Sequence, residues 1–69
     1  MIDEQFVKVG QKFKSQVNGA ILEIIKIGHN WLGETYVTVK DEKNRFGETG
    51  KEWFKRLLLD VIKEDKAND

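Results

Sequence analysis

The stretch Ala20–Ile27, AILEIIKI, is the densest apolar run in the chain and decides the predicted fold. It contains no Gly or Pro, and its Ile-rich composition suits a buried, pleated strand better than a helix. Its apolar residues do not alternate strictly, because Leu22 and Ile24 share one phase while the odd-numbered isoleucines share the other. The pattern predicts a central strand that is either covered on both faces or interrupted by a bulge near Ile24.

Shorter strand patterns flank this run on both sides. The dipeptide Asn18-Gly19 predicts a hairpin turn before it, since both central positions of a type I′ turn need positive φ. The segment 28–34 is too irregular for a strand and predicts a loop, whereas Asn44 suits the left-handed conformation of a later turn. The predicted strands are 6–9, 12–17, 20–27, 35–40 and 45–48.

A helix is expected after the last of these strands. Thr49 and Glu52 have the spacing of a capping box, in which each side chain accepts a hydrogen bond from a backbone N–H near the helix start. Apolar residues then recur at steps of three and four, as on one face of a helix. They are Trp53, Phe54, Leu57, Leu58, Val61 and Ile62. This stripe predicts a C-terminal helix that packs on one face of the sheet.

These elements predict an α+β fold, a small antiparallel β-meander of three to five strands with one C-terminal α-helix packed on it. The glycine-containing turn before an Ile-rich strand is also similar to small SH3-like barrels, so a rolled sheet is an alternative. We expect one domain, 1–69, with an ordered core of about 6–63 and loose termini at 1–5 and 64–69. The predicted core residues are Phe13, Val17, Ile21, Leu22, Ile24, Ile25, Ile27, Val37, Val39, Phe54, Leu57, Leu58 and Val61.

The composition limits the possible functions. Twelve basic and twelve acidic residues cancel, so the strong net positive charge typical of many nucleic-acid-binding proteins is absent. The chain has no cysteine, which excludes disulfides and thiolate metal sites. It has no apolar run near the ~20 residues of a membrane span, and its start is unlike a secretory signal. We expect a cytoplasmic protein that does not associate with membranes.

The sequence offers no set of residues for catalysis. Ser15 is the one serine and His29 the one histidine, and neither lies in a nucleophile motif. A metal site needs three or four ligands, and Glu34 is the one candidate near His29. The segment 47–51 lacks the spacing of a phosphate-binding loop. We therefore predict a protein that is not an enzyme, with no catalytic residues, no metal and no cofactor.

The predicted loop offers a contact site for another protein. His29, Asn30, Trp31 and Leu32 place a large aromatic residue in an irregular segment, where binding residues are common. Trp31 either covers the end of the sheet or is exposed for contact, whereas Trp53 is expected in the core. We favour a non-enzymatic protein-interaction or accessory module whose partner is another protein. A homodimer through the helix stripe around Trp53 remains open.

Nucleic-acid binding by the outward face of the sheet is the alternative. Alternation places Tyr36, Thr38 and Lys40 on that face, with Lys26 and Arg45 beside them. Basic side chains next to an aromatic ring can combine phosphate contact with base stacking. The order of three antiparallel strands and a helix also resembles the DNA-binding arm domains of tyrosine-type integrases, a resemblance of topology alone.

Overall fold

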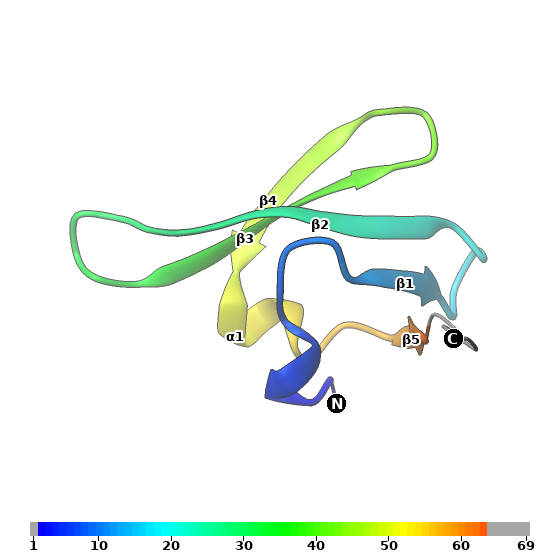
Figure 1. Cartoon of the computed structure of the whole chain (residues 1–69), viewed down its shortest axis with the longest axis horizontal. Coiled ribbons are helices and arrows are strands. Elements are labelled where there is room, and N and C mark those ends of the chain that lie inside the picture. Colours follow the sequence, from blue (N-terminus) through cyan, green and yellow to red (C-terminus); the bar gives the residue numbers. More distant parts are fainter. Residues whose placement is uncertain (1, 64–69) are drawn as a thin grey trace, which may run out of the picture.

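The computed structural model describes residues 2–63, which form an antiparallel five-stranded sheet with one short α-helix (Figure 1). A 3₁₀ helix, η1 (Glu4–Phe6), precedes the sheet. The remaining elements are β1 (Lys12–Ser15), β2 (Ile21–His29), β3 (Thr35–Asp41), β4 (Phe46–Gly50), α1 (Lys51–Phe54) and β5 (Leu59–Ile62). The strands lie in the order β4-β3-β2-β1-β5, so the last strand pairs with the first. No helix within residues 2–63 is long and apolar enough to cross a membrane.

Strand β2 is the centre of the sheet, as its apolar run predicts. It pairs with β1 on one side and with β3 on the other. The register with β3 shifts between Ile24 and Lys26, so of the two alternatives for this strand the bulge near Ile24 is the correct one. The extra residue reverses the phase of the strand, so Ile24 lies opposite Val39 before the bulge and Ile27 lies opposite Val37 after it. Ile24 and Ile27 therefore lie on the same face of the sheet, although one has an even and the other an odd number.

The core is small and lies between the sheet, α1 and the N-terminal segment. Its buried residues are Ile2, Phe13, Ile24, Val37 and Phe54. The rings of Phe13 and Phe54 meet edge to face, with centroids 5.3 Å apart. The predicted core residues Ile27, Val39 and Val61 are partly buried against this cluster. Ile21, Leu22 and Ile25 are also partly buried but lie outside the cluster among the described residues.

The predicted long helix is wrong after its first turn. Helix α1 ends at Phe54, and β5 pairs with β1 in a register that sets Val61 opposite Phe13. Leu59 and Val61, two residues apart as on one face of a strand, pack on the core. Leu57 and Leu58 are exposed, so both are wrong as core residues. The free edge of β1 explains why 59–62 form a strand. Pairing with β5 gives hydrogen-bond partners to backbone N–H and C=O groups of β1 that would lack them if this segment were a helix. The stripe proposed as a dimer surface is therefore not formed.

The start of the helix also differs from the prediction. The N-cap is Gly50, which makes no side-chain cap hydrogen bond, and Thr49 lies in β4 opposite Val37. The capping box is thus wrong, because pairing with β3 holds Thr49 in the sheet.

The N-terminal residues form contacts that the sequence did not predict. The expected loose segment 1–5 includes buried Ile2, whose N–H donates to the Lys55 carbonyl oxygen at 2.9 Å. The Glu4 carboxylate accepts hydrogen bonds from Lys51 and Lys55, both at 3.0 Å. The expected strand over 6–9 is absent from the described chain because η1 and a turn occupy this region. The predicted loose segment 64–69 lies outside the described residues.

The two predicted turns occur at the expected positions, but the turn before β2 is of a different type from the one predicted. Asn44 has a φ of 61°, which confirms its left-handed conformation. Before β2, Gly19 has a φ of 75°, but Asn18 is not in the positive region required by a type I′ turn. A longer turn results, in which the Ser15 carbonyl accepts from the Gly19 N–H at 2.9 Å. It leaves Val17 exposed, so Val17 is wrong as a core residue.

Candidate functional site

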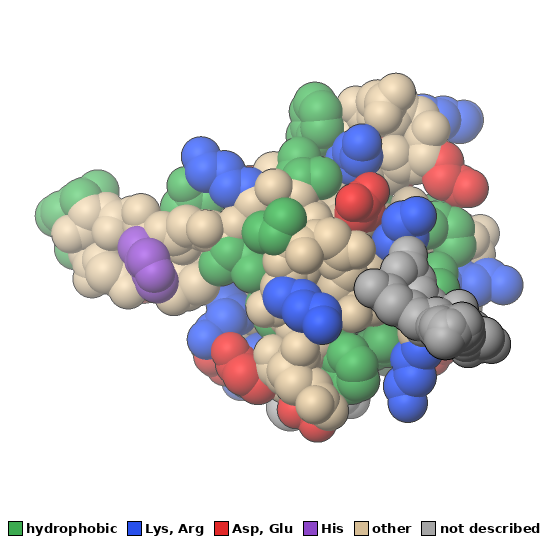
Figure 2. All heavy atoms as spheres, in the orientation of Figure 1, with side chains coloured by type: hydrophobic (Ala, Val, Ile, Leu, Met, Phe, Trp, Pro, Cys, Tyr) green, Lys and Arg blue, Asp and Glu red, His purple; other side chains and the backbone are tan. Residues whose placement is uncertain are grey.

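The turn between β2 and β3 carries the most exposed aromatic residue of the described chain. This hairpin extends away from the body of the molecule (Figure 1), and hydrophobic side chains gather at its end (Figure 2). Trp31 is 91% exposed and Leu32 is 62% exposed. We call residues 29–32 the hairpin tip. Of the two placements left open for Trp31, the exposed one is therefore correct.

Hydrogen bonds that involve the Asn30 side chain hold this turn in its shape. The Asn30 Oδ1 accepts from the N–H groups of Leu32 at 2.9 Å and Glu34 at 3.0 Å. The Asn30 Nδ2 donates to the Glu34 carboxylate at 2.9 Å, and Gly33 adopts a φ of 84°. Asparagine favours such turns because its side chain can replace a backbone acceptor. The hydrogen-bonded loop holds Trp31 and Leu32 outward.

The other two tip residues have supporting positions. His29 is the last residue of β2 and not part of the loop, and its Nδ1 lies 3.1 Å from the Thr35 Oγ1. Asn30 is exposed and hydrogen-bonded within the loop. The four predicted contact residues are therefore adjacent, but Trp31 and Leu32 alone present apolar surface at the tip.

The predicted nucleic-acid face is formed in part. Tyr36, Thr38 and Lys40 alternate along β3, and the register sets Lys26 directly opposite Thr38. The same register sets Glu23 opposite Lys40, and Glu48 lies opposite Thr38 from the other side. Residues directly opposite in antiparallel strands share a face, so carboxylates are interspersed among these lysines.

Tyr36 owes its position to a glycine on the neighbouring strand. Gly28 lies opposite Tyr36, and a Cβ added to Gly28 would meet the Tyr36 hydroxyl oxygen at 2.7 Å. The tyrosine side chain thus occupies the space that the missing Cβ leaves.

Arg45 is separate from that face. It lies in the turn before β4, and its Nε is 3.1 Å from the Asp41 Oδ2. The Arg45 backbone N–H also donates to Asp41, and hydrogen bonds from Arg45 and Lys43 hold the pKa of the Asp41 carboxyl below its ordinary value of 3.8. Arg45 therefore stabilises its own turn, and its sequence proximity to Lys40 does not place it in the candidate site.

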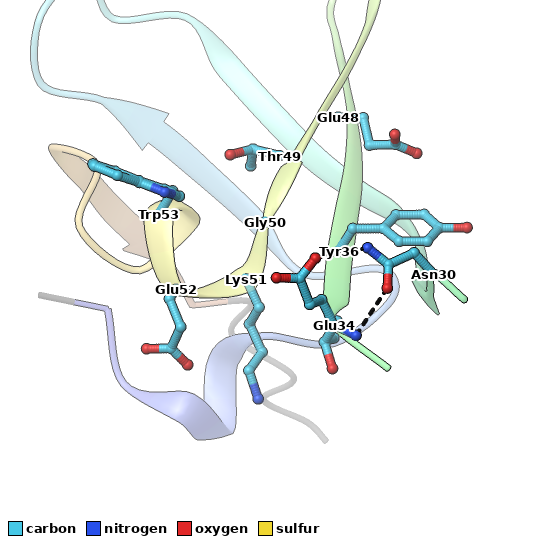
Figure 3. Close-up of a pocket in the computed structure, with 10 residues that line it drawn as sticks. Asn30, Glu34, Tyr36, Glu48, Thr49, Gly50, Lys51, Glu52 and Trp53 are labelled. Atoms are coloured by element: carbon cyan, nitrogen blue, oxygen red, sulfur yellow. Dashed lines mark hydrogen bonds between the residues drawn. The ribbon is translucent and has the colours of Figure 1, made fainter. Parts of the chain in front are cut away.

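A groove of about 710 Å³ lies where β3, β4, α1 and the β2–β3 turn meet (Figure 3). Its walls include two aromatic residues, Tyr36 and Trp53. The remaining lining residues are Asn30, Glu34, Thr35, Glu48, Thr49, Gly50, Lys51 and Glu52. Trp53 is 68% exposed, so its expected place in the core is wrong. In so short a helix Phe54 points into the core, and the adjacent Trp53 points elsewhere.

The groove has more acidic than basic side chains. Glu34, Glu48 and Glu52 contribute carboxylates, and Lys51 contributes one ammonium group. That ammonium is 3.0 Å from the Glu4 carboxylate, so its charge is already matched. No three His, Asp or Glu side chains within residues 2–63 gather as a metal-binding group. The groove was not predictable from the sequence, because its walls come from four separate elements.

The one serine and the one histidine lie far apart along the sheet. Ser15 ends β1 beside the start of β2, whereas His29 ends β2. The Ser15 Oγ accepts from the Val17 N–H at 3.2 Å.

Comparisons of this chain with protein-family models, with curated proteins and with solved structures found no match.

Proposed function

We propose that this protein is a non-enzymatic module that binds another protein through the hairpin tip. The observation that carries the proposal is Trp31, which is 91% exposed on a hydrogen-bonded turn. A tryptophan in this position contributes little to the core, but it can bury a large area in a partner. Tryptophan is also enriched among the residues that dominate binding energy at protein interfaces.

The order of the turn supports the same proposal. Binding costs less conformational entropy when the contact residues are already held in place. The bonds made by Asn30 fix the backbone on both sides of Trp31 and Leu32. We infer a partner with an apolar pocket that receives the indole ring, while Leu32 packs at its rim.

The test compares the immobilised wild-type protein with three variants in lysate from cells that express it. Trp31→Ala should abolish capture of the partner, and Leu32→Ala should weaken it. Val17→Ala is the matched control, because Val17 is also exposed but lies in the turn before β2. Circular dichroism would verify that all three variants fold. Equal capture by the wild-type protein and Trp31→Ala would refute the proposal.

We infer that the sheet is an SH3-like roll, the finer form of the fold expected from the sequence. Three features support this inference: β5 pairs with β1, α1 lies between β4 and β5, and a bulge bends the central strand. In such a roll β4 and β5 are the two edges. An experimental structure with β5 away from β1 would contradict this inference.

Nucleic-acid binding is a second candidate function. The cross-strand position of Lys26 favours it, because Lys26 joins Tyr36, Thr38 and Lys40 on one face. The double variant Lys26→Glu/Lys40→Glu should weaken binding to single-stranded oligonucleotides at low salt, and Lys43→Glu in the β3–β4 turn is the control. Affinity that is unchanged by the double variant and by salt would end this candidate.

We also propose a cytoplasmic location with no membrane association, as the sequence predicts. Imaging of the tagged protein tests it, and a membrane-bound signal would contradict it.

A further inference from the structure

Strand β4 presents a free edge in the sheet formed by residues 2–63. It is the outermost strand beside β3. The Asp41 N–H donates to the Arg45 carbonyl at 3.0 Å, which sets the hydrogen-bonding phase of this antiparallel pair. Because that phase alternates, Gly47 and Thr49 direct their backbone groups at β3, and Phe46 and Glu48 direct theirs outward. Outward-directed backbone groups of this kind can pair with an added strand.

The groove lies along the end of this edge and has an aromatic ring on each side. Figure 3 shows Trp53 on one side of the chain at Gly50 and Tyr36 on the other. Gly50 has no side chain, so the backbone between the two rings is accessible. An extended segment directs alternate side chains to opposite sides. A segment lying beside β4 would therefore present alternate residues to the Trp53 side of the groove, whereas the Tyr36 ring lies on the β3 side, against Gly28.

The charges of the groove indicate which segment fits. Glu34 and Glu48 have carboxylates on its walls, whereas Glu52 lies 4.0 Å from Lys55 and Lys51 is paired with Glu4. Lysine or arginine side chains would match the carboxylates of Glu34 and Glu48. A second copy of this chain fits poorly, because symmetric pairing of two β4 strands would bring two acidic grooves together.

We propose that the free edge of β4 binds an extended segment of a partner protein with lysine or arginine at alternate positions, adding a sixth strand to the sheet. This inference goes beyond the hairpin tip, since it names a second surface and the chemistry of its ligand. Asn30 and Glu34 belong to both the β2–β3 turn and the groove wall, so one partner can reach both surfaces.

The test uses a fluorescent seven-residue peptide in which lysine alternates with valine, titrated by anisotropy at low salt. The double variant Glu34→Gln/Glu48→Gln should weaken binding about fivefold to tenfold, as expected for two partly exposed ion pairs. Glu42→Gln in the β3–β4 turn is the matched control and should bind like the wild-type protein. Amide NMR shifts should concentrate at Phe46–Gly50 and at the Trp53 indole.

Two further probes test the strand pairing and separate this inference from the proposed function. A peptide with its β4-facing amides N-methylated should lose binding, and equal binding would overturn the added strand. Trp31→Ala should bind the lysine peptide normally even where it loses the tip partner. No binding at millimolar peptide, or no effect of the glutamine variants, would overturn the inference and leave the hairpin-tip proposal intact.

Discussion

Two neighbouring isoleucines at the bulge in β2, Ile24 and the unpaired Ile25, should differ sharply in their contribution to stability. Ile24 has no exposed surface, and Ile24→Ala removes three carbon groups from the core. At ~0.8 kcal/mol for each group this is about 2.4 kcal/mol, and the resulting cavity raises the expected cost to about 2–5 kcal/mol. Ile25 is partly buried outside the core cluster of the described residues, so Ile25→Ala should cost only about 1 kcal/mol. The apolar pattern alone would assign Ile25 the full cost of a core residue.

Urea unfolding followed by far-ultraviolet circular dichroism measures the difference. Tryptophan fluorescence is a poor probe here, since Trp31 and Trp53 are both exposed. If Ile24→Ala fails to fold, Ile24→Val should still cost about 0.5–1.5 kcal/mol. Ile25→Val is its matched control and should shift the midpoint less. Equal losses at the two positions, or a larger loss at Ile25, would refute the register of the bulge.

Three further predictions concern the N-terminal ion pairs, the sheet and the turn. Hydrogen bonds from Lys51 and Lys55 lower the pKa of Glu4 below 4.5, so the stability from this pairing is complete above pH 4.5 and is lost as the pH falls through the folded pKa. Glu4→Gln should flatten this part of a pH–stability profile, and an unaltered profile would contradict the pairing. Gly28→Ala should displace the Tyr36 ring and cost about 1 kcal/mol in urea unfolding, whereas unchanged Tyr36 NMR shifts would contradict the contact. Asn30→Ala should speed amide hydrogen exchange at Leu32 and Glu34, and unaltered exchange would show that its side chain does not hold the turn.

The parts of the fold that were predictable are those with local signals. The β2 run and the alternation of β3 each identify a strand without reference to distant residues. The bulge near Ile24 was visible because the apolar phase changes within one short segment. Strand β5 was missed because the apolar residues of 53–62 also fit a helical period. Its pairing with β1, far away in sequence, decided between the two periods.

The candidate site was likewise predictable where the signal is local and not where it depends on strand pairing. Trp31 lies in an irregular segment bounded by glycines, so its position in a loop was predictable, whereas the sequence was compatible with both an exposed and a covered side chain. The alternation of Tyr36 with Lys40 also correctly predicted a shared face. Glu48 beside Thr38 could not be foreseen, because a cross-strand neighbour depends on the register and not on the sequence pattern.

The most direct test of the account replaces Trp31 with a photoreactive amino acid and irradiates cells that express the protein. The matched control has the same amino acid at Lys43, an exposed position in the β3–β4 turn. A discrete adduct that forms from position 31 and not from position 43 is the predicted result, because the hairpin tip is the surface that enters the partner. No adduct from position 31, or the same adducts from both positions, would contradict the proposal that this protein acts through the hairpin tip.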